Sequence, residues 1–106
     1  MQIERIKFER TGGFAGIRLA AEINVNELPD DEKTEIIEMF EKANFEELSE
    51  KIAGRMPVPD EFVYYIEVES GQQEHKIRAG ESALPSDMEP LLRTLETITK
   101  RQMRNK

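Results

Sequence analysis

The sequence has no cysteine and a single histidine among its 106 residues. Without cysteine, a disulfide scaffold, a cysteine nucleophile, a thiolate zinc site and an iron–sulfur site are all excluded. One histidine leaves few side chains that titrate near neutral pH, where an acid–base catalyst has to work. We therefore expect a protein that is not an enzyme, with no catalytic residue, no cofactor and no metal site.

Other patterns that chemistry requires are also missing. Carboxylates are abundant, but they fall at the spacings of a helix surface, and none has the spacing and turn glycine of a calcium loop. The segment 12–16, GGFAG, lacks the order of a GxGxxG motif, the lysine of a phosphate-binding loop and a following helix. The sequence thus predicts no phosphate-binding site.

Long apolar runs are absent as well. The chain begins MQIER, which is not the start of a signal peptide, and 35% of all residues are charged. The formal net charge is -7, which opposes the phosphate contacts on which nucleic-acid affinity depends. We expect a soluble cytoplasmic protein with no membrane and no nucleic acid among its partners.

The length of 106 residues suits one domain spanning residues 1–106. From Gln2 to Val25, apolar residues alternate around Gly12-Gly13, a dipeptide typical of a type I′ hairpin turn. A loop of only these two glycines would oppose three pairs: Phe8 with Ile17, Ile6 with Leu19, and Glu4 with Ala21. The same register turns Phe14 and Arg18 away from the apolar face.

The period changes between Glu27 and Glu50, where apolar residues follow a helical spacing that begins near Pro29. Asn44 interrupts this helix, and Phe45, Leu48 and Ile52 predict a second, short helix. Ten acids and two bases lie between Glu27 and Glu50, so this segment carries a charge of -8. The acidic helical face is a candidate surface for a basic partner, although solvation alone also explains it.

A proline-containing connector, Met56–Asp60, separates this region from a second hairpin. Phe62–Glu69 and Glu74–Ala79 have the composition of strands, and Ser70-Gly71 is the expected turn. That turn sets three pairs: Ile66 with His75, Tyr64 with Ile77, and Phe62 with Ala79. In this register His75 is a histidine at the edge of the core and has no catalytic role.

A final helix is predicted after Ser86 or Asp87, either of which can cap it. Its apolar stripe consists of Met88, Leu91, Leu92, Leu95 and Ile98. The basic end suits a helix C-terminus, and we expect a frayed tail over about residues 100–106.

Together these elements predict an α+β fold, in which two β-hairpins form a four-stranded, largely antiparallel sheet and helices pack on one face. The predicted order is ββααββα. The predicted core contains Ile6, Phe8, Ile17, Leu19, Ile23, Phe40, Phe62, Tyr64, Ile66, Leu91, Leu92 and Leu95.

One feature exceeds what a stable fold requires: an aromatic residue, Phe14, that the hairpin register directs toward solvent. A type I′ turn needs glycine but no aromatic neighbour. Phe14 is either an anchor for a partner or a surface residue that covers Arg18 or packs beneath a neighbouring loop.

The segment 9–17, ERTGGFAGI, resembles the opening of the emfourin family, small protein inhibitors of thermolysin-like zinc metalloproteases such as protealysin. Further similarity extends over most of the chain, at ELP 27–29, PDEFVY 59–64, ALP 83–85 and PLL 90–92. The resemblance implies inhibition of such a protease by occlusion of its active site. The partner-binding residues that it implies are Glu9, Thr11, Gly12, Gly13, Phe14 and Ala15.

Thermolysin-like enzymes favour an apolar side chain just after the cleaved bond, so Phe14 on a stiff hairpin could fill that pocket. A turn carbonyl or the Glu9 carboxylate could cover the zinc ion. Two alternatives remain open: a non-inhibitory protein-binding domain that uses the acidic helices, and a small-molecule-binding or catalytic domain. The target protease and the oligomeric state are not predicted.

Overall fold

Four strands and two α-helices make up the part of the chain that the computed structural model describes, residues 3–12, 18–48 and 61–104. The strands are β1 (Arg5–Gly12), β2 (Leu19–Asn24), β3 (Phe62–Ser70) and β4 (Gln73–Gly80). The helices are α1 (Asp30–Lys42) and α2 (Glu89–Arg104). Short 3-10 turns occur at Val25–Glu27, Phe45–Glu47, Glu81–Ala83 and Ser86–Met88. In the described residues, no helix is long and apolar enough to cross a membrane.

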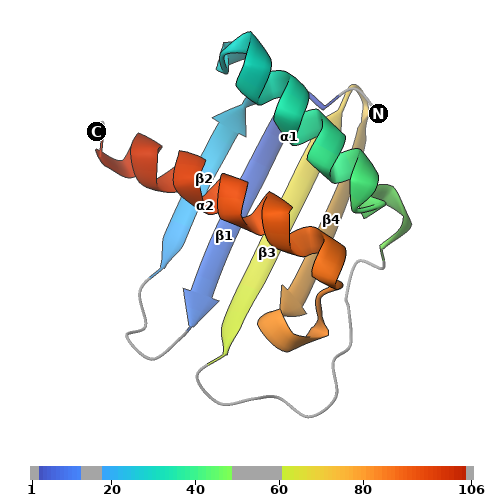
Figure 1. Cartoon of the computed structure of the whole chain (residues 1–106), viewed down its shortest axis with the longest axis vertical. Coiled ribbons are helices and arrows are strands. Elements are labelled where there is room, and N and C mark those ends of the chain that lie inside the picture. The colour runs from blue at the N-terminus through green and yellow to red at the C-terminus, as the bar shows by residue number, and fades with distance from the viewer. Residues whose placement is uncertain (1–2, 13–17, 49–60, 105–106) are drawn as a thin grey trace.

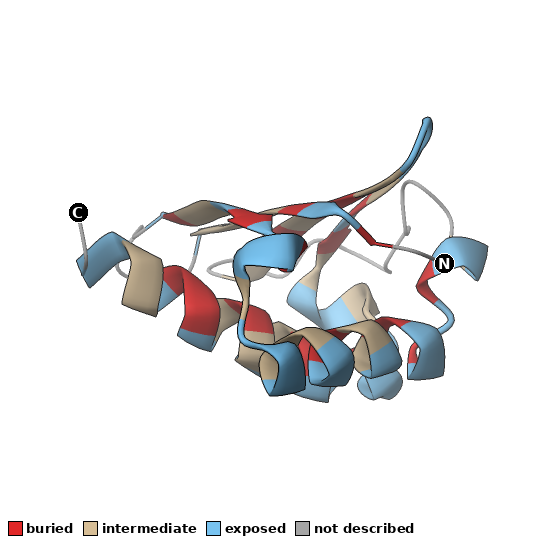
Figure 2. Cartoon of the chain, turned by 90° about the horizontal axis from the view of Figure 1, so that it is seen from above, coloured by how far each residue is buried: buried red, intermediate tan, exposed pale blue. Residues whose placement is uncertain are grey.

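The strands form one antiparallel sheet in the order β2-β1-β3-β4, so the first strands of the two hairpins are neighbours at its centre. Both helices lie on one face of this sheet, and no described helix covers the opposite face (Figures 1 and 2). The α+β class, the four-stranded antiparallel sheet and the one-sided helical layer are confirmed. We call the helix-bearing side the covered face and the other side the open face.

The first hairpin differs from its predicted register. Ile6 lies opposite Ile23 and Phe8 opposite Ala21, a slip of four residues from the expected pairs. Gly12 ends β1, paired with Phe62 of β3, and β2 begins only at Leu19. The Gly12-Gly13 dipeptide is therefore not the whole loop, because Gly12 still belongs to the strand. An even slip keeps every side chain on its predicted face.

The second hairpin is displaced by two residues. Ile66 lies opposite Ile77, and Ser70 pairs with Gln73, which leaves Gly71 and Gln72 as the turn rather than Ser70 and Gly71. Gly71 has a φ of 63°, a left-handed conformation that glycine adopts without strain and serine does not. The turn thus lies where glycine, and not serine, occupies its first left-handed position.

The expected second helix after Asn44 is wrong. Asn44 adopts a left-handed conformation with φ of 51°, which ends α1, and only a 3-10 turn over Phe45–Glu47 follows. Leu48 is extended, with ψ of 142°, so no helix continues through it. Over the described residues, the observed order of strands and α-helices is ββαββα. Ile52 and the Met56–Asp60 connector lie outside the described residues.

The last helix begins differently from the prediction. Ser86 and Asp87 belong to a 3-10 turn that leads into α2, so neither residue caps the helix. At its other end, α2 ends at Arg104, and fraying of residues 100–106 stays a prediction. The Arg101 guanidinium donates to the Glu32 carboxylate of α1 at 2.8 and 3.3 Å, which joins the two helices.

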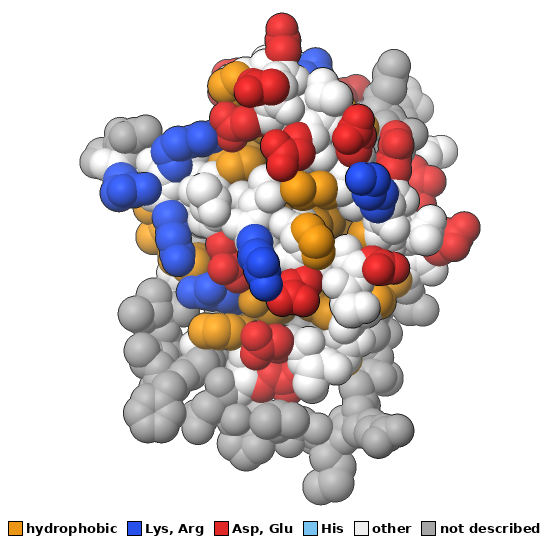
Figure 3. All heavy atoms as spheres, viewed as in Figure 1, with side chains coloured by type: hydrophobic (Ala, Val, Ile, Leu, Met, Phe, Trp, Pro, Cys, Tyr) orange, Lys and Arg blue, Asp and Glu red, His pale blue; other side chains and the backbone are white. Residues whose placement is uncertain are grey.

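The two helices differ in charge. Asp and Glu side chains gather in the upper part of the covered face, over α1, whereas Lys and Arg side chains lie along the C-terminal half of α2 (Figure 3). Acids in the first turn of α1 lie at its partly positive end, and bases in the last turn of α2 lie at its partly negative end. Both arrangements stabilise the helices.

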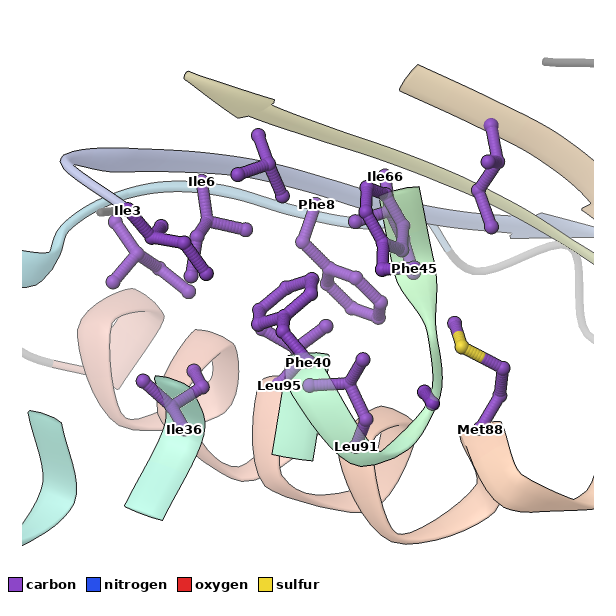
Figure 4. Close-up of a cluster of buried hydrophobic side chains, with 14 of the residues drawn as sticks. Ile3, Ile6, Phe8, Ile36, Phe40, Phe45, Ile66, Met88, Leu91 and Leu95 are labelled. Atoms are coloured by element: carbon purple, nitrogen blue, oxygen red, sulfur yellow. The ribbon is translucent and has the colours of Figure 1, made fainter. Parts of the chain in front are cut away.

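The core fills the space between the sheet and the helices (Figure 4). Of the predicted core, the buried members are Ile6, Phe8, Leu19, Ile23, Phe40, Tyr64, Ile66, Leu91 and Leu95. Phe62 and Leu92 are only partly buried, and Ile17 lies outside the described residues. Buried apolar residues beyond that list are Ile3, Val25, Ile36, Ala43, Phe45, Val68, Ile77, Ala79, Met88 and Ile98.

Candidate functional site

One end of the sheet carries the segment that the sequence identifies as partner-binding. The end of β1, the start of β2, the start of β3 and the end of β4 all meet there, because every neighbouring pair of strands is antiparallel (Figure 1). We call this the loop end. Glu9, Thr11 and Gly12 are described, whereas Gly13, Phe14 and Ala15 lie outside the described residues.

Glu9 and Thr11 lie on the open face near the loop end. Each has an apolar or aromatic partner on β3: Glu9 is opposite Tyr65 and Thr11 is opposite Val63. These four residues and Arg78 line an open hollow of about 260 Å³. The open face next to the loop end is therefore a shallow surface, too exposed to enclose a small substrate.

The Glu9 carboxylate is already engaged within the chain. Arg18, just before β2, donates to it through Nε at 3.1 Å and Nη2 at 3.2 Å. This bidentate pair raises the pKa of Arg18, through its hydrogen bond to Glu9 and then through the charge of Glu9. The pair links β1 to the residue just before β2, and Arg18 neutralises the charge with which Glu9 would attract a metal ion.

Gly12, the last residue of β1, cannot be replaced by a residue with a side chain without strain, because of its backbone conformation and its close neighbours. Its φ is 86°, and a Cβ atom at this position would lie 2.7 Å from the carbonyl oxygen of Glu61. The Glu61 side chain passes close to Gly80 and accepts a hydrogen bond from Ser82 Oγ at 2.7 Å. Glycine at position 12 thus lets β1 approach the start of β3 at the loop end.

A polar cluster lies on the covered face at the same end. Arg10 Nη1 lies 3.2 Å from Glu96 Oε1 of α2, and the Tyr64 hydroxyl donates to the same oxygen at 3.1 Å. The Arg10 guanidinium also stacks 4.3 Å from the centroid of the Phe62 ring. Burial, and then the charge of Glu96, raises the pKa of Tyr64 to about 12. We call these four residues the Arg10 cluster.

The sequence analysis missed the Arg10 cluster, although the pattern contains a signal for it. Arg10 continues the alternation of Ile6 and Phe8 toward the covered face, and Glu96 follows Leu95 beside the apolar stripe of α2. A base at an apolar position of the strand and an acid at the border of the helix stripe indicate a partly buried pair. The alternation alone does not show which acid approaches which base.

His75 lies far from the loop end, next to the β3–β4 turn. Its Nε2 atom is 2.9 Å from the Leu48 carbonyl oxygen, and its ring meets that of Phe45 edge-on, at 5.2 Å between centroids. His75 is half-buried, so the expected position at the edge of the core is confirmed.

Three carboxylates on the sheet are close enough to share a cation. Oxygens of Glu67, Glu69 and Glu74 lie within 4.8 Å of one another. The Lys7 ammonium group is 3.8 Å from Glu67 and 3.9 Å from Glu69, and Arg5 is 3.6 Å from Glu69. Because cationic side chains already neutralise two of the acids, this group is an ion-pair network on the open face.

Comparison with known proteins gives a family. A search of curated proteins and a search of solved structures each return no match. A family model described as Emfourin matches residues 8–96, which contain the GGFAG segment, most of both hairpins, all of α1 and the first half of α2. The chain belongs to the emfourin family.

Proposed function

We propose that the protein inhibits a thermolysin-like zinc metalloprotease by occluding its active site with the segment Gly12-Gly13-Phe14. Membership in the emfourin family indicates a metalloprotease-inhibitor role, with a protease as the kind of partner. Such a role is consistent with a protein that is not an enzyme. The observation that supports the finer proposal is the position of Gly12, which ends β1 at the loop end and is followed in the sequence by Gly13 and Phe14.

The stem that carries the segment suits a rigid inhibitor. β1 is a central strand, paired with β3 over its full length from Arg5 to Gly12 and with β2 from Arg5 to Arg10. A strand held on both sides has little conformational freedom left to lose when a partner docks. In this proposal Phe14 enters the apolar pocket that a thermolysin-like enzyme offers just after the cleaved bond.

An inhibitor that occludes the active site has to cover the zinc ion of the target or keep water away from it. Glu9 is a poorer candidate for that contact than a backbone carbonyl of the loop, because Arg18 holds both Glu9 oxygens. Breaking this pair would expose the Arg18 charge to the desolvation of an interface. We assign Glu9 and Arg18 to bracing the hairpin stem, and zinc contact to the loop backbone.

A second candidate is a protein-binding domain that uses the acidic face of α1. Glu35, Glu38 and Glu41 are exposed there, and Figure 3 shows how densely carboxylates gather over this helix. Such a surface would attract a basic partner through long-range electrostatics. In that case binding would fall steeply as salt concentration rises, and the loop end would not be involved.

Kinetic inhibition of a thermolysin-like protease tests the proposal. With a small peptide substrate, we expect competitive inhibition at a one-to-one ratio, because an occluded active site cannot admit substrate. Mass spectrometry of the inhibitor after long incubation should show an intact chain. Absence of inhibition, inhibition that is not competitive, or rapid cleavage of the chain between residues 12 and 16 would contradict the proposal.

A further inference from the structure

The Arg10 cluster makes the last side-chain contact between β1 and the helical layer. Residues of β1 alternate between the faces, and beyond Arg10 the next residue on the covered face is Gly12, which has no side chain. The Arg10 side chain is 14% exposed and the Glu96 side chain 20% exposed. A partly buried ion pair therefore lies two residues before the end of the strand.

Three elements meet in this cluster. Arg10 comes from β1, Tyr64 and Phe62 from β3, and Glu96 from α2. Phe62 lies opposite Gly12 and Tyr64 lies opposite Arg10, so the contacts bracket the final residues of β1. Because one oxygen of Glu96 accepts a hydrogen bond from Tyr64 and forms an ion pair with Arg10, α2 joins the two central strands at the loop end.

The cluster is an inefficient way to gain stability. The Arg10 Nε atom is buried and has no hydrogen-bond partner in the described part of the chain. Replacement of a buried ion pair by apolar residues of similar volume is often neutral or stabilising. A retained pair with directional contacts instead holds its elements in one relative position, since each hydrogen bond and the stacked ring has a narrow geometry.

We propose that Arg10 is a positioning residue for inhibition: through Glu96, Tyr64 and Phe62 it fixes the end of β1 relative to α2 and so sets how the Gly12-Gly13-Phe14 segment leaves the sheet. This inference rests on the proposed inhibitory function. Arg10 itself lies on the covered face and acts through Glu96, without touching the protease.

A double-mutant cycle tests this role. The variants are Arg10→Met, Glu96→Leu and the double variant. Only the double variant removes both charges of the pair. Arg101→Met is the matched control. Arg101 of α2 pairs with Glu32 of α1. Loss of this ion pair should lower stability without altering the loop end. Inhibition constants are measured below every melting temperature.

We expect Arg10→Met and Glu96→Leu each to weaken inhibition by about tenfold, and the double variant to be no weaker than the worse single variant, as for two residues that act as one unit. Arg101→Met should inhibit within about twofold of the original protein. Normal inhibition by the double variant would overturn the proposal. Weakening by Arg10→Met alone, with Glu96→Leu normal, would mean that Arg10 contacts the protease, which also overturns it.

Amide hydrogen exchange separates this inference from the proposed function, because it needs no protease. In the double variant, exchange of the amides of residues 10–12 should accelerate at least tenfold relative to residues 5–7 of the same strand. Unchanged exchange at residues 10–12 would overturn the positioning role whatever the inhibition data show. Phe14→Ala in the same kinetic series tests the function: normal inhibition by Phe14→Ala would overturn the role of the loop itself.

Discussion

Gly12 and Gly71 both adopt a positive φ, but only Gly12 is also confined by a neighbouring backbone. A Cβ atom at position 12 would lie 2.7 Å from the Glu61 carbonyl oxygen, whereas nothing lies within 4 Å of one at position 71. Gly71→Ala should therefore lower the free energy of unfolding by only the left-handed strain, about 1–2 kcal/mol. Gly12→Ala adds an overpacking cost and should lower it by roughly 2–5 kcal/mol.

Urea unfolding of both variants checks this difference. Because the two substitutions are chemically identical and both positions are exposed, Gly71→Ala is the matched control. Equal losses at the two positions would mean that β1 and β3 can separate at the loop end at no cost. The close approach of Gly12 to Glu61 would then not hold the loop end together.

Tyr64 makes the stability of the fold depend on pH in the alkaline range. Its pKa rises from 10.0 in a free side chain to about 12 in the folded protein. Above about pH 10 the unfolded chain releases this proton while the folded protein keeps it, so stability falls between pH 10 and pH 12. The expected loss is on the order of 2 kcal/mol, less than two pH units at about 1.4 kcal/mol each, because solvent screens part of the effect.

Denaturant unfolding of the original protein and Tyr64→Phe at pH 8 and pH 11 measures this effect. The original protein should lose stability relative to Tyr64→Phe as the pH rises. Tyr65, whose pKa is also raised by burial and then by Glu67, is retained in both proteins, so its contribution cancels. A constant difference between the two proteins would show that the Tyr64 hydroxyl is not shielded beneath α2.

At the scale of elements, α2 contributes to the core mainly through one row of its stripe. Leu95 is 0% exposed, whereas Leu92 is only partly buried at the edge of the same core. Leu95→Ala should therefore lower the free energy of unfolding by roughly 2–5 kcal/mol. Leu92→Ala should cost about half as much or less, because fewer of its atoms leave water on folding.

Chemical denaturation of the two variants under the same solvent conditions measures the free energy of unfolding that each substitution costs. The two leucines have equal helix propensity, so the difference between them reports burial alone. A larger loss for Leu92→Ala would mean that α2 is rotated about its axis relative to its position in Figure 4.

Alternation and helical spacing were enough to predict which face each strand buries. Both hairpin registers were predicted wrongly, by four residues and by two, yet the even slips left the buried sets intact. The register itself depends on the pairing of β1 with β3, a contact between residues distant in sequence. No local turn signal such as Gly12-Gly13 contains that information.

The short helix expected after Asn44 failed for a local reason. Phe45 and Leu48 do have a helical spacing, but Asn44 in a left-handed conformation and extended Leu48 confine the segment to one 3-10 turn. Phe45 is nevertheless buried, edge-on to Phe40 at 5.1 Å between ring centroids. Apolar spacing thus identified a buried residue correctly and its secondary structure wrongly.

At the scale of the whole molecule, charge and candidate site are separated. The acidic residues concentrate on α1 in the covered layer (Figure 3), whereas the loop end carries the ion-paired residues Glu9, Arg18, Arg10 and Glu96. Sequence reasoning reached Glu9, Thr11 and Gly12 through the resemblance, because their motif is local. It did not find Arg18 or the Arg10 cluster as partners, because these pairs depend on the register and on the crossing of α2.

The central claim is that the loop end, through Phe14, binds the protease. Its most direct test is parallel measurement of the inhibition constant and the melting temperature for Phe14→Ala. The comparison variant is Glu38→Lys, at an exposed position of α1. Loss of an aromatic anchor should weaken inhibition by about 2 kcal/mol or more, roughly thirtyfold, with the melting temperature nearly unchanged. Glu38→Lys should inhibit normally. Abolished inhibition by Glu38→Lys together with normal inhibition by Phe14→Ala would contradict the claim and assign binding to the acidic face of α1.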